Sequence, residues 1–577
     1  MKILLASILV LPFLAQAQKP QAAPSAVPAR TEPVQGIPVT NQLVISKCGA
    51  CHTKDEKGNM LRISWERATP EGWEEAIKRM VRLRGVSLTP DEARTILKYL
   101  ATYHGLAPDE AKPIMYYAEH RVLDETNIPN DDVRGACANC HVLARPLSWR
   151  RTPEDWKDLA NLHIALYPQA DEAFRLGLAA GGFDENRPHR DPGAPLPVDN
   201  ALAFLGKTAP LETPEWAAWR ARMRAPKLAG RWLVSAYLPG RGKFYGEMDV
   251  DPSSGSDDEF TTRVKLMSVK DGSTISRTGH SVVYAGYAWR GRSKGTPAAK
   301  ATPDDLGSEM REVMWVSPDQ STAEGRWFWG EYQEFGFDVK LQRPSADPTL
   351  IGVDRTLLKT GSQGTHVRLL AESLPAQVAP ADLDFGTGVT VKRIVSHTPT
   401  EIVAEVDVAA DAVPGKRDIA FRRSVLQSAI AVYDRIDYVK VTPDSALAHL
   451  GSQQHPKGYQ QFVAVAYQRG ADDKPHTADD IELGPIDANW SVEEFYSVYG
   501  DDDKEFVGSL SNTGLFTPAS DGPNPQRKFS RNNYGDVWVV ATAKEEKDKE
   551  GRPLIGKSYL VVTVPTYIKW DQPEVGQ

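Results

Sequence analysis

Cysteine is scarce in this chain, which has four in 577 residues. Charge is also nearly balanced, with 68 lysines and arginines against 76 aspartates and glutamates, a formal net charge of −8. A mildly acidic net charge argues against a nucleic-acid binder driven by phosphate contacts. No run of 18 apolar residues follows the N-terminus, so the sequence predicts no membrane span. At roughly 100–200 residues per domain, the length predicts three to five domains.

Familiar catalytic motifs are missing as well. The sequence has no G-x-S-x-G, H-E-x-x-H, Walker or Rossmann motif in a suitable context. Two acidic loops, 249–259 and 470–484, do not match the calcium loop of helix–loop–helix proteins, and we interpret them as solvated turns. We therefore predict no catalytic residue in this chain.

The first 17 residues have the form of a secretory signal peptide. Lys2 gives the positive start, residues 3–14 are apolar, and residues 15–17 read A-Q-A, a small-x-small cleavage site. The apolar run is too short to act as a stop-transfer helix. We expect a mature, exported chain from about Gln18, in which the Pro- and Ala-rich residues 18–37 form a flexible leader.

All four cysteines lie in two C-x-x-C-H segments, "CGACH" at 48–52 and "CANCH" at 137–141. This pattern attaches haem c, because two thiols add to the haem vinyl groups and the adjacent histidine reaches the iron. The alternatives are a redox pair, a zinc site or structural disulfides. A redox pair does not need the histidine, and one such segment alone cannot close a tetrahedral zinc site, although two together could. Two copies behind a signal peptide favour two haems c. The predicted thioether residues are Cys48, Cys51, Cys137 and Cys140, and the predicted iron ligands are His52 and His141.

A repeat downstream of each C-x-x-C-H segment indicates the second iron ligand. "TPEGWEEAIKRM" at 69–80 and "TPEDWKDLANLH" at 152–163 agree at Thr, Pro, Glu and Trp. Thr is a suitable helix N-cap and Pro a suitable first helical residue. Seven residues after the Trp, two helical turns along the same face, the first copy has Met80 and the second His163. These are the two residue types that complete haem iron, so we predict Met80 and His163 as the distal ligands.

Other side chains could supply a sixth ligand, and the short motif is not specific. Thr213-Pro214-Glu215-Trp216 resembles the same helix start without a preceding C-x-x-C-H segment, and we interpret it as a plain helix opening. Residues 89–105 predict a further helix with Thr89 as N-cap, Glu92 completing a capping box and Gly105 as the stop. Residues 180–200 predict a Gly- and Pro-rich loop near the second haem. The other candidate ligands in this region are Met60, Met115, His104, His120 and His189. Met60 lies only eight residues past His52, too near to reach the opposite haem face, whereas Met115, His104 and His120 remain alternatives.

Past residue 226 the pattern changes to short alternating strands between turn residues, typical of antiparallel β-structure. We predict a multidomain chain that combines α and all-β parts: a tandem cytochrome c-like helical dihaem domain, an antiparallel β-barrel and two immunoglobulin-like β-sandwich domains. The predicted bounds are 1–17 for the signal peptide, 18–37 for the leader, 38–225 for the dihaem domain with lobes at about 38–128 and 129–225, 226–343 for the barrel, and 344–440 and 441–577 for the sandwiches.

A signal peptide, two C-x-x-C-H segments with T-P-E-x-W helices, and a "GRW…YGE" barrel before two sandwich domains resemble the α subunit of quinohaemoprotein amine dehydrogenases. The resemblance covers essentially the whole mature chain, and its specific part is the dihaem segment. It implies a periplasmic heterotrimer in which a small γ subunit carries a quinone and oxidises primary amines to aldehydes, beside a β-propeller β subunit. It carries Cys48, Cys51, His52, Cys137, Cys140 and His141 over as haem residues, with Met80 and His163 as distal ligands.

The resemblance assigns electron transfer to this chain. Its two iron-containing haems would take electrons from the partner's quinone and pass them to a soluble acceptor such as azurin or a cytochrome c. Methionine ligation raises a haem's potential, so we expect the His52/Met80 haem to lie above the His141/His163 haem. Two alternatives belong to other classes: a dihaem peroxidase-like enzyme, and a haem protein whose β domains bind a surface partner.

Overall fold

The computed structural model describes residues 35–119, 128–138, 140–176, 191–300, 302–330, 335–453, 455–548 and 550–565. The predicted signal peptide and most of the predicted leader lie outside these residues. So do His120, His189 and most of the predicted loop at 180–200. Within the described residues, no helix is long and apolar enough to cross a membrane.

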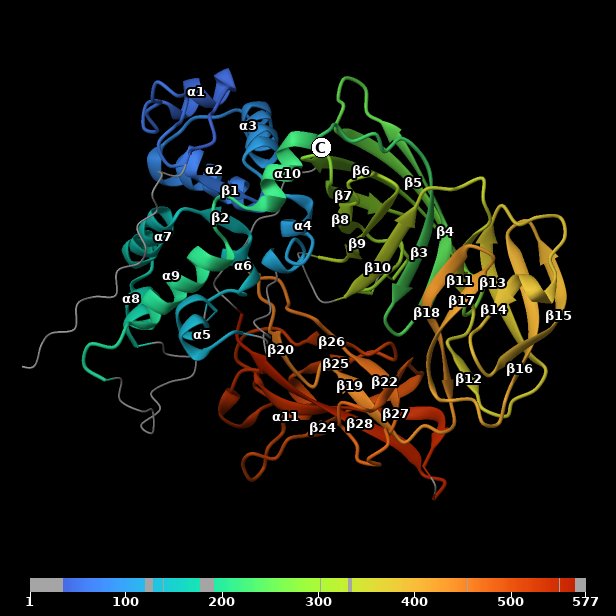
Figure 1. Ribbon diagram of the computed structural model, residues 1–577. Helices are drawn as coiled ribbons and strands as arrows, with labels where there is room; N and C mark the ends of the chain where they lie inside the picture. The colour runs from blue at the N-terminus through green and yellow to red at the C-terminus, as the bar shows by residue number, and fades with distance from the viewer. Residues whose placement is uncertain are drawn as a thin grey trace, which may run out of the picture. The chain divides into compact units, whose positions relative to one another are not determined.

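The first part of the chain is helical, as predicted, and leads into the β part (Figure 1). Proline at the first helical position opens several helices because its fixed φ suits a helix start and its missing N–H is not needed there. The α-helices are α1 (Gln42–Cys48), α2 (Pro70–Arg84), α3 (Pro90–Tyr103), α4 (Pro108–Ala111), α5 (Asp131–Cys137), α6 (Ala144–Leu147), α7 (Pro153–Leu166), α8 (Pro168–Leu176), α9 (Pro197–Thr208) and α10 (Pro214–Arg222). Short 3-10 turns lie at Ile63–Trp65 and Tyr117–Glu119.

The predicted helix starts are confirmed. Thr69, Thr152 and Thr213 each accept a backbone N–H at the start of α2, α7 and α10. Thr89 and Glu92 form the predicted capping box of α3, in which each side chain binds the other's backbone N–H. The chain then turns at His104, one residue before the predicted stop.

Two short strands join the helical lobes. Strand β1 (Glu66–Ala68) precedes α2, strand β2 (Trp149–Arg151) precedes α7, and the two pair antiparallel. Arg67 lies opposite Arg150 in this ladder. The starts of the two repeat copies are therefore hydrogen-bonded to one another.

Eight antiparallel strands close into a barrel, with β10 paired to β3 (Figure 1). Alternating side chains fill the interior, where Phe244 and Phe337 meet edge to face at 5.2 Å between ring centroids. The strands are β3 (Gly230–Leu238), β4 (Gly242–Pro252), β5 (Glu259–Ser268), β6 (Thr274–Tyr284), β7 (Ala288–Lys294), β8 (Met310–Val316), β9 (Thr322–Phe328) and β10 (Gly336–Gln342).

The barrel is bonded to the first helical lobe. Arg290 on β7 binds Glu71 on α2 with two contacts of 2.5 and 3.2 Å, and both side chains are almost fully buried. Tyr287 donates its hydroxyl to the Leu106 carbonyl at 2.9 Å, and the Trp315 indole donates to the Pro108 carbonyl at 2.9 Å. Because one partner of the ion pair is Glu71, the helix that carries Met80 is fixed to the barrel wall.

Two further β domains follow. In the first, sheets ordered β11-β13-β16-β15 and β12-β18-β17-β14 enclose an apolar core. The strands are β11 (Thr349–Val353), β12 (Leu357–Lys359), β13 (Thr365–Glu372), β14 (Leu383–Asp384), β15 (Val389–Thr398), β16 (Glu401–Val408), β17 (Gly415–Phe421) and β18 (Ser424–Tyr433). A 3-10 turn lies at Pro380–Asp382.

The last domain has sheets ordered β19-β22-β23 and β20-β28-β27-β24, with a smaller sheet β21-β26-β25. A second apolar core lies within this domain. The strands are β19 (Tyr438–Thr442), β20 (Ser445–His449), β21 (Gln460–Gln461), β22 (Val463–Gln468), β23 (Ile481–Pro485), β24 (Ala488–Glu494), β25 (Gly508–Leu510), β26 (Leu515–Pro518), β27 (Gly535–Lys547) and β28 (Pro553–Thr563). The domain also holds α11 (Asp503–Phe506) and a 3-10 turn at Lys528–Ser530.

Candidate haem sites

The two cysteine segments have the same local structure. Cys48 is the last residue of α1 and Cys137 the last residue of α5, and both are partly buried. Cys51 and Cys140 lie in the following turns and are exposed. None of the four thiols forms a disulfide. All four therefore remain available for thioether bonds.

The helix before each segment is also repeated, which the sequence reasoning missed. Asn41 caps α1 by accepting the Val44 N–H at 3.1 Å, and Asn130 caps α5 by accepting the Val133 N–H at 2.9 Å. Both valines are fully buried. Each seven-residue helix ends at the first cysteine. The sequence pattern N-x-x-V-x-x-x-C occurs at 41–48 and at 130–137. This pattern would have predicted the repeated capped helix.

The predicted proximal histidines are held in a suitable tautomer. His52 donates its Nδ1–H to the Leu61 carbonyl at 2.9 Å, and His141 donates its Nδ1–H to the Val142 carbonyl at 3.1 Å. A carbonyl can only accept, so Nδ1 carries the proton and Nε2 carries the lone pair that binds metals. Such a bond orients a metal-binding imidazole and increases its basicity.

The predicted distal residues occupy matching helices. On α2, the buried Trp73 donates its indole N–H to the His104 carbonyl at 2.8 Å; on α7, the buried Trp156 donates to the Ala209 carbonyl at 3.2 Å. His104 caps the end of α3 and Ala209 caps the end of α9, so these bonds have equivalent places in the two lobes. With the Trp anchored in the core, the residue seven positions later is partly exposed in both copies: Met80 in one, His163 in the other.

His163 shares the Nδ1 hydrogen bond with both proximal histidines and a lowered pKa with His141. Its Nδ1–H donates to the Leu159 carbonyl at 2.8 Å, one turn back on α7. Burial, with smaller contributions from neighbouring charges, lowers the pKa of His141 to about 4. Burial likewise lowers the pKa of His163, so both imidazoles are neutral at pH 7.

Three of the alternative ligands are more deeply buried than Met80 and His163. Met60 and His104 are fully enclosed and Met115 is 5% exposed. The His104 ring packs edge-on against Trp73, at 6.2 Å between ring centroids, and burial lowers its pKa to about 4. A haem ligand needs an open side toward the porphyrin, which the partly exposed Met80 and His163 have. The burial of the three alternatives argues against them.

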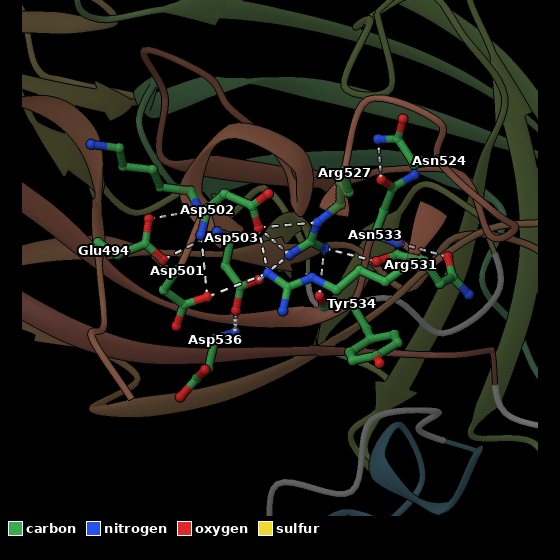
Figure 2. A network of polar contacts seen from close by, with 12 residues as sticks. Glu494, Asp501, Asp502, Asp503, Asn524, Arg527, Arg531, Asn533, Tyr534 and Asp536 are labelled. Carbon is green, nitrogen blue, oxygen red and sulfur yellow. Dashed lines mark hydrogen bonds and ion pairs between the residues drawn. The ribbon is translucent and has the colours of Figure 1, made fainter. Parts of the chain in front are cut away.

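A separate polar cluster in the last domain has the composition of a cation site (Figure 2). Among the described residues, Glu494, Asp501 and Asp503 place ligand atoms within 4.8 Å of one another. Arg527 and Arg531 already supply positive charge there: both contact Asp502 and Asp503. Glu494 accepts the backbone N–H groups of Asp503 and Lys504 at 3.1 and 3.3 Å. We interpret the cluster as a set of ion pairs that joins the loop after β24 to the residues on either side of the turn at Lys528–Ser530.

Neither acidic loop singled out in the sequence, 249–259 or 470–484, contributes to that cluster. Asp251 pairs with Arg263 at 2.7 Å, and Asp258 pairs with Lys98 of α3 at 2.8 Å. Asp480 accepts the Tyr438 hydroxyl at 2.6 Å. Such pairing agrees with the interpretation of these loops as structural turns.

Comparison with known protein families covers the described domains. Four family models match in order: quinohemoprotein amine dehydrogenase A, alpha subunit, haem binding, at residues 39–176, and the alpha subunit domains II, III and IV at 225–344, 347–434 and 439–575. This chain belongs to the quinohemoprotein amine dehydrogenase alpha subunit family. It therefore contains a haem-binding domain, and the resemblance inferred from the sequence is confirmed.

Other comparisons add little to the alpha subunit assignment. A search of curated proteins finds no match. A redesigned β-barrel is 15% identical, over 20% of this chain and 92% of its own, at a TM-score of 0.16. Human protocadherin-24 EC1-2 is 14% identical, over 39% of this chain and 98% of its own, at a TM-score of 0.15. Scores this low support no argument about function.

Proposed function

We propose that this alpha subunit is the dihaem c electron-transfer subunit of a periplasmic amine dehydrogenase. The observation that carries the proposal is the duplicated site. Each lobe has a C-x-x-C-H segment at the end of a capped helix, a histidine oriented through Nδ1, and a partly exposed Met or His on a matching second helix.

The residues present fit two haems c. Cys48 and Cys51 would form the thioether bonds of the first haem, and His52 and Met80 would bind its iron. In the second lobe the corresponding residues are Cys137, Cys140, His141 and His163. A haem c supplies one-electron chemistry at its iron, and two axial protein ligands suit electron transfer rather than substrate binding. The imidazoles of His52, His141 and His163 each use Nδ1 to bind a backbone carbonyl, which leaves Nε2 for such ligation.

The substrate chemistry is assigned to a partner. The quinone that the resemblance implies is a cysteine tryptophylquinone, made from a subunit's own side chains. All four cysteines of this sequence belong to the C-x-x-C-H segments, so none is left to form it in this chain. We therefore infer that a small γ subunit carries the quinone and oxidises the primary amine to an aldehyde, and that a β-propeller β subunit completes the heterotrimer. The electrons would leave this subunit to a soluble acceptor, azurin or a cytochrome c.

Mass spectrometry of the purified native complex tests the proposal. We expect two covalent haems on this chain, one at each C-x-x-C-H segment, and a small partner whose mass shows a crosslinked quinone. A single haem, or a complex without such a partner, would overturn the assignment.

A further inference from the structure

One buried carboxylate, Glu110 of α4, is bound by both lobes. Arg67 of β1 holds it with two bonds, Nη1 to Oε2 at 2.7 Å and Nη2 to Oε1 at 3.0 Å. Arg150 of β2 donates from Nε to Oε1 at 3.2 Å. The exposed fractions of the three side chains are 0% for Arg67, 9% for Arg150 and 4% for Glu110. This group, Arg67, Glu110 and Arg150, is called the interlobe cluster below.

The two arginines are equivalent residues of the repeat. Each lies two positions before the threonine that caps the following helix, Thr69 or Thr152, and they face one another in the β1–β2 ladder. Arg67 thus leads into the helix with Met80, and Arg150 leads into the helix with His163. The two arginines of the interlobe cluster therefore have the same place in the two repeat copies.

Further contacts fix the carboxylate. Glu110 accepts the Thr213 hydroxyl at 2.8 Å and the Ala107 N–H at 2.7 Å. Arg67 lies over the Trp216 ring, 4.5 Å from its centroid. Thr213 and Trp216 belong to the helix opening that the sequence reasoning interpreted as plain. It contributes directly to the interlobe cluster.

The interlobe cluster carries unbalanced charge. Burial raises the pKa of Glu110, but the bonds and charge of Arg67, with the charge of Arg150, outweigh burial and lower it to about 2. One carboxylate faces two guanidinium groups, so the cluster has a net charge of +1 at neutral pH. Charges removed from water act over longer distances than surface charges, which solvent and salt screen. A positive charge near a haem favours the reduced iron, which carries one positive charge fewer.

We propose that the interlobe cluster is a shared positioning element whose buried positive charge raises the reduction potentials of both haems together. The inference rests on the proposed function, because it requires a haem in each lobe. It assigns a role to Glu110, Arg67 and Arg150, none of which would touch a haem iron as a ligand.

Two substitutions test the inference because they change the charge in opposite directions. Glu110→Gln raises the cluster's charge from +1 to +2 and should shift both potentials upward. Arg150→Met lowers it to zero, leaves the two-bond Arg67–Glu110 pair in place, and should shift both potentials downward. The measurement is a spectroelectrochemical titration of the intact complex, resolved for each haem. Arg150→Lys retains the charge and should restore potentials close to those of the unmodified protein.

A matched control is another ion pair between the lobes. Arg62 and Asp158 contact at 2.8 Å, but their side chains are 45% and 48% exposed. Asp158→Asn removes the same formal charge as Glu110→Gln at a screened position, so both potentials should stay unchanged. If Glu110→Gln does not fold because two arginines are left without a counter-charge, comparison of Arg150→Met with Arg150→Lys still decides the question.

The outcomes separate the two proposals. Haem content of the unmodified complex is measured first, and fewer than two haems would overturn the proposed function and this inference with it. With two haems present, shifts of the same sign in Glu110→Gln and Arg150→Met would overturn only the inference. So would a shift confined to one haem, or an Arg150→Lys variant that behaves like Arg150→Met.

Discussion

The two helical lobes have the same framework but differ in the proposed iron ligand and in the surroundings of the motif glutamate. The proposed distal residue is Met80 in the first lobe and His163 in the second. The motif glutamate is Glu71 in the first lobe, buried against Arg290 of the barrel, whereas its counterpart Glu154 is exposed. The repeat therefore preserves the capped helices and the anchoring tryptophans. The copies diverge at the proposed iron ligand and in the attachment to the rest of the chain.

The largest effect should come from removing the thiols of one lobe. In Cys137→Ala/Cys140→Ala, the second haem loses both thioether bonds, and covalent haem should fall from two per chain to one. Cys48→Ala/Cys51→Ala should give the same stoichiometry but leave the other haem. Haem absorbance in alkaline pyridine, compared with protein mass after denaturation, measures this. A variant that retains two covalent haems would contradict the assignment.

Exchanging the distal residue should remove the difference between the haems. Axial ligands change haem potentials over a range of about 0.8 V, and methionine raises the potential. Met80→His should lower the first haem's potential toward that of the second, with loss of the methionine-to-iron charge-transfer band. An unchanged gap in a redox titration would exclude Met80 as a ligand. The reciprocal His163→Met should raise the second potential and leave the first unchanged.

The two motif glutamates should differ in stability. Glu71→Gln leaves Arg290 buried without its full counter-charge, and breaking a buried pair costs about 3–5 kcal/mol. Glu154→Gln changes an exposed side chain and should stay within about 0.5 kcal/mol. Denaturant unfolding, followed at the haem absorption, compares the two. Equal losses would mean that Glu71–Arg290 does not attach the first lobe to the barrel.

Acid should weaken the junction between the lobes by a smaller amount. The pKa of Glu110 is about 2 in the folded chain against an ordinary value of 4.5. A lowered pKa means that ionised Glu110 stabilises the folded state. Its contribution is complete above pH 4.5 and is lost as the pH falls toward 2, by about 3 kcal/mol in total. Unfolding midpoints at pH 6 and pH 3 measure the loss. Glu110→Gln should remove this part of the pH dependence, and a variant with an unchanged acid slope would show that other groups cause it.

Local rules predicted much of the fold. Thr-Pro pairs predicted the starts of α2, α3, α7 and α10, because a capping hydroxyl and the fixed φ of proline act within one turn of helix. The alternation of apolar and polar residues predicted the barrel and the β domains, and the family matches follow the predicted order. The cysteines, the histidines and the distal residues were all read from spacing along the chain, and as haem residues they remain predictions.

Polar contacts between residues far apart in the chain could not be predicted from local sequence patterns. Each copy contains a Trp-x-Arg pattern, at 65–67 and at 149–151. Aligning the copies on this pattern matches Arg67 with Arg151, whereas in the structure Arg67 lies opposite Arg150. Arg151 instead pairs with Glu66 and lies over the Trp149 ring at 4.3 Å. Glu110 lies 43 residues from Arg67 and 103 from Thr213, in a short helix whose local start pattern does not indicate these partners. Which charges meet in the core depends on how the lobes pack, and no local pattern encodes that.

The β1–β2 ladder has a consequence for assembly. Each lobe contributes one strand of the two-stranded sheet, so neither lobe forms this sheet alone. The helical region thus resembles a dimer within one chain, because a covalent connection, and not the concentration of a second subunit, keeps the two lobes together. Short connections give effective concentrations on the order of millimolar. The two halves would therefore remain associated at any dilution of the protein, which two separate cytochromes of the same affinity could not achieve.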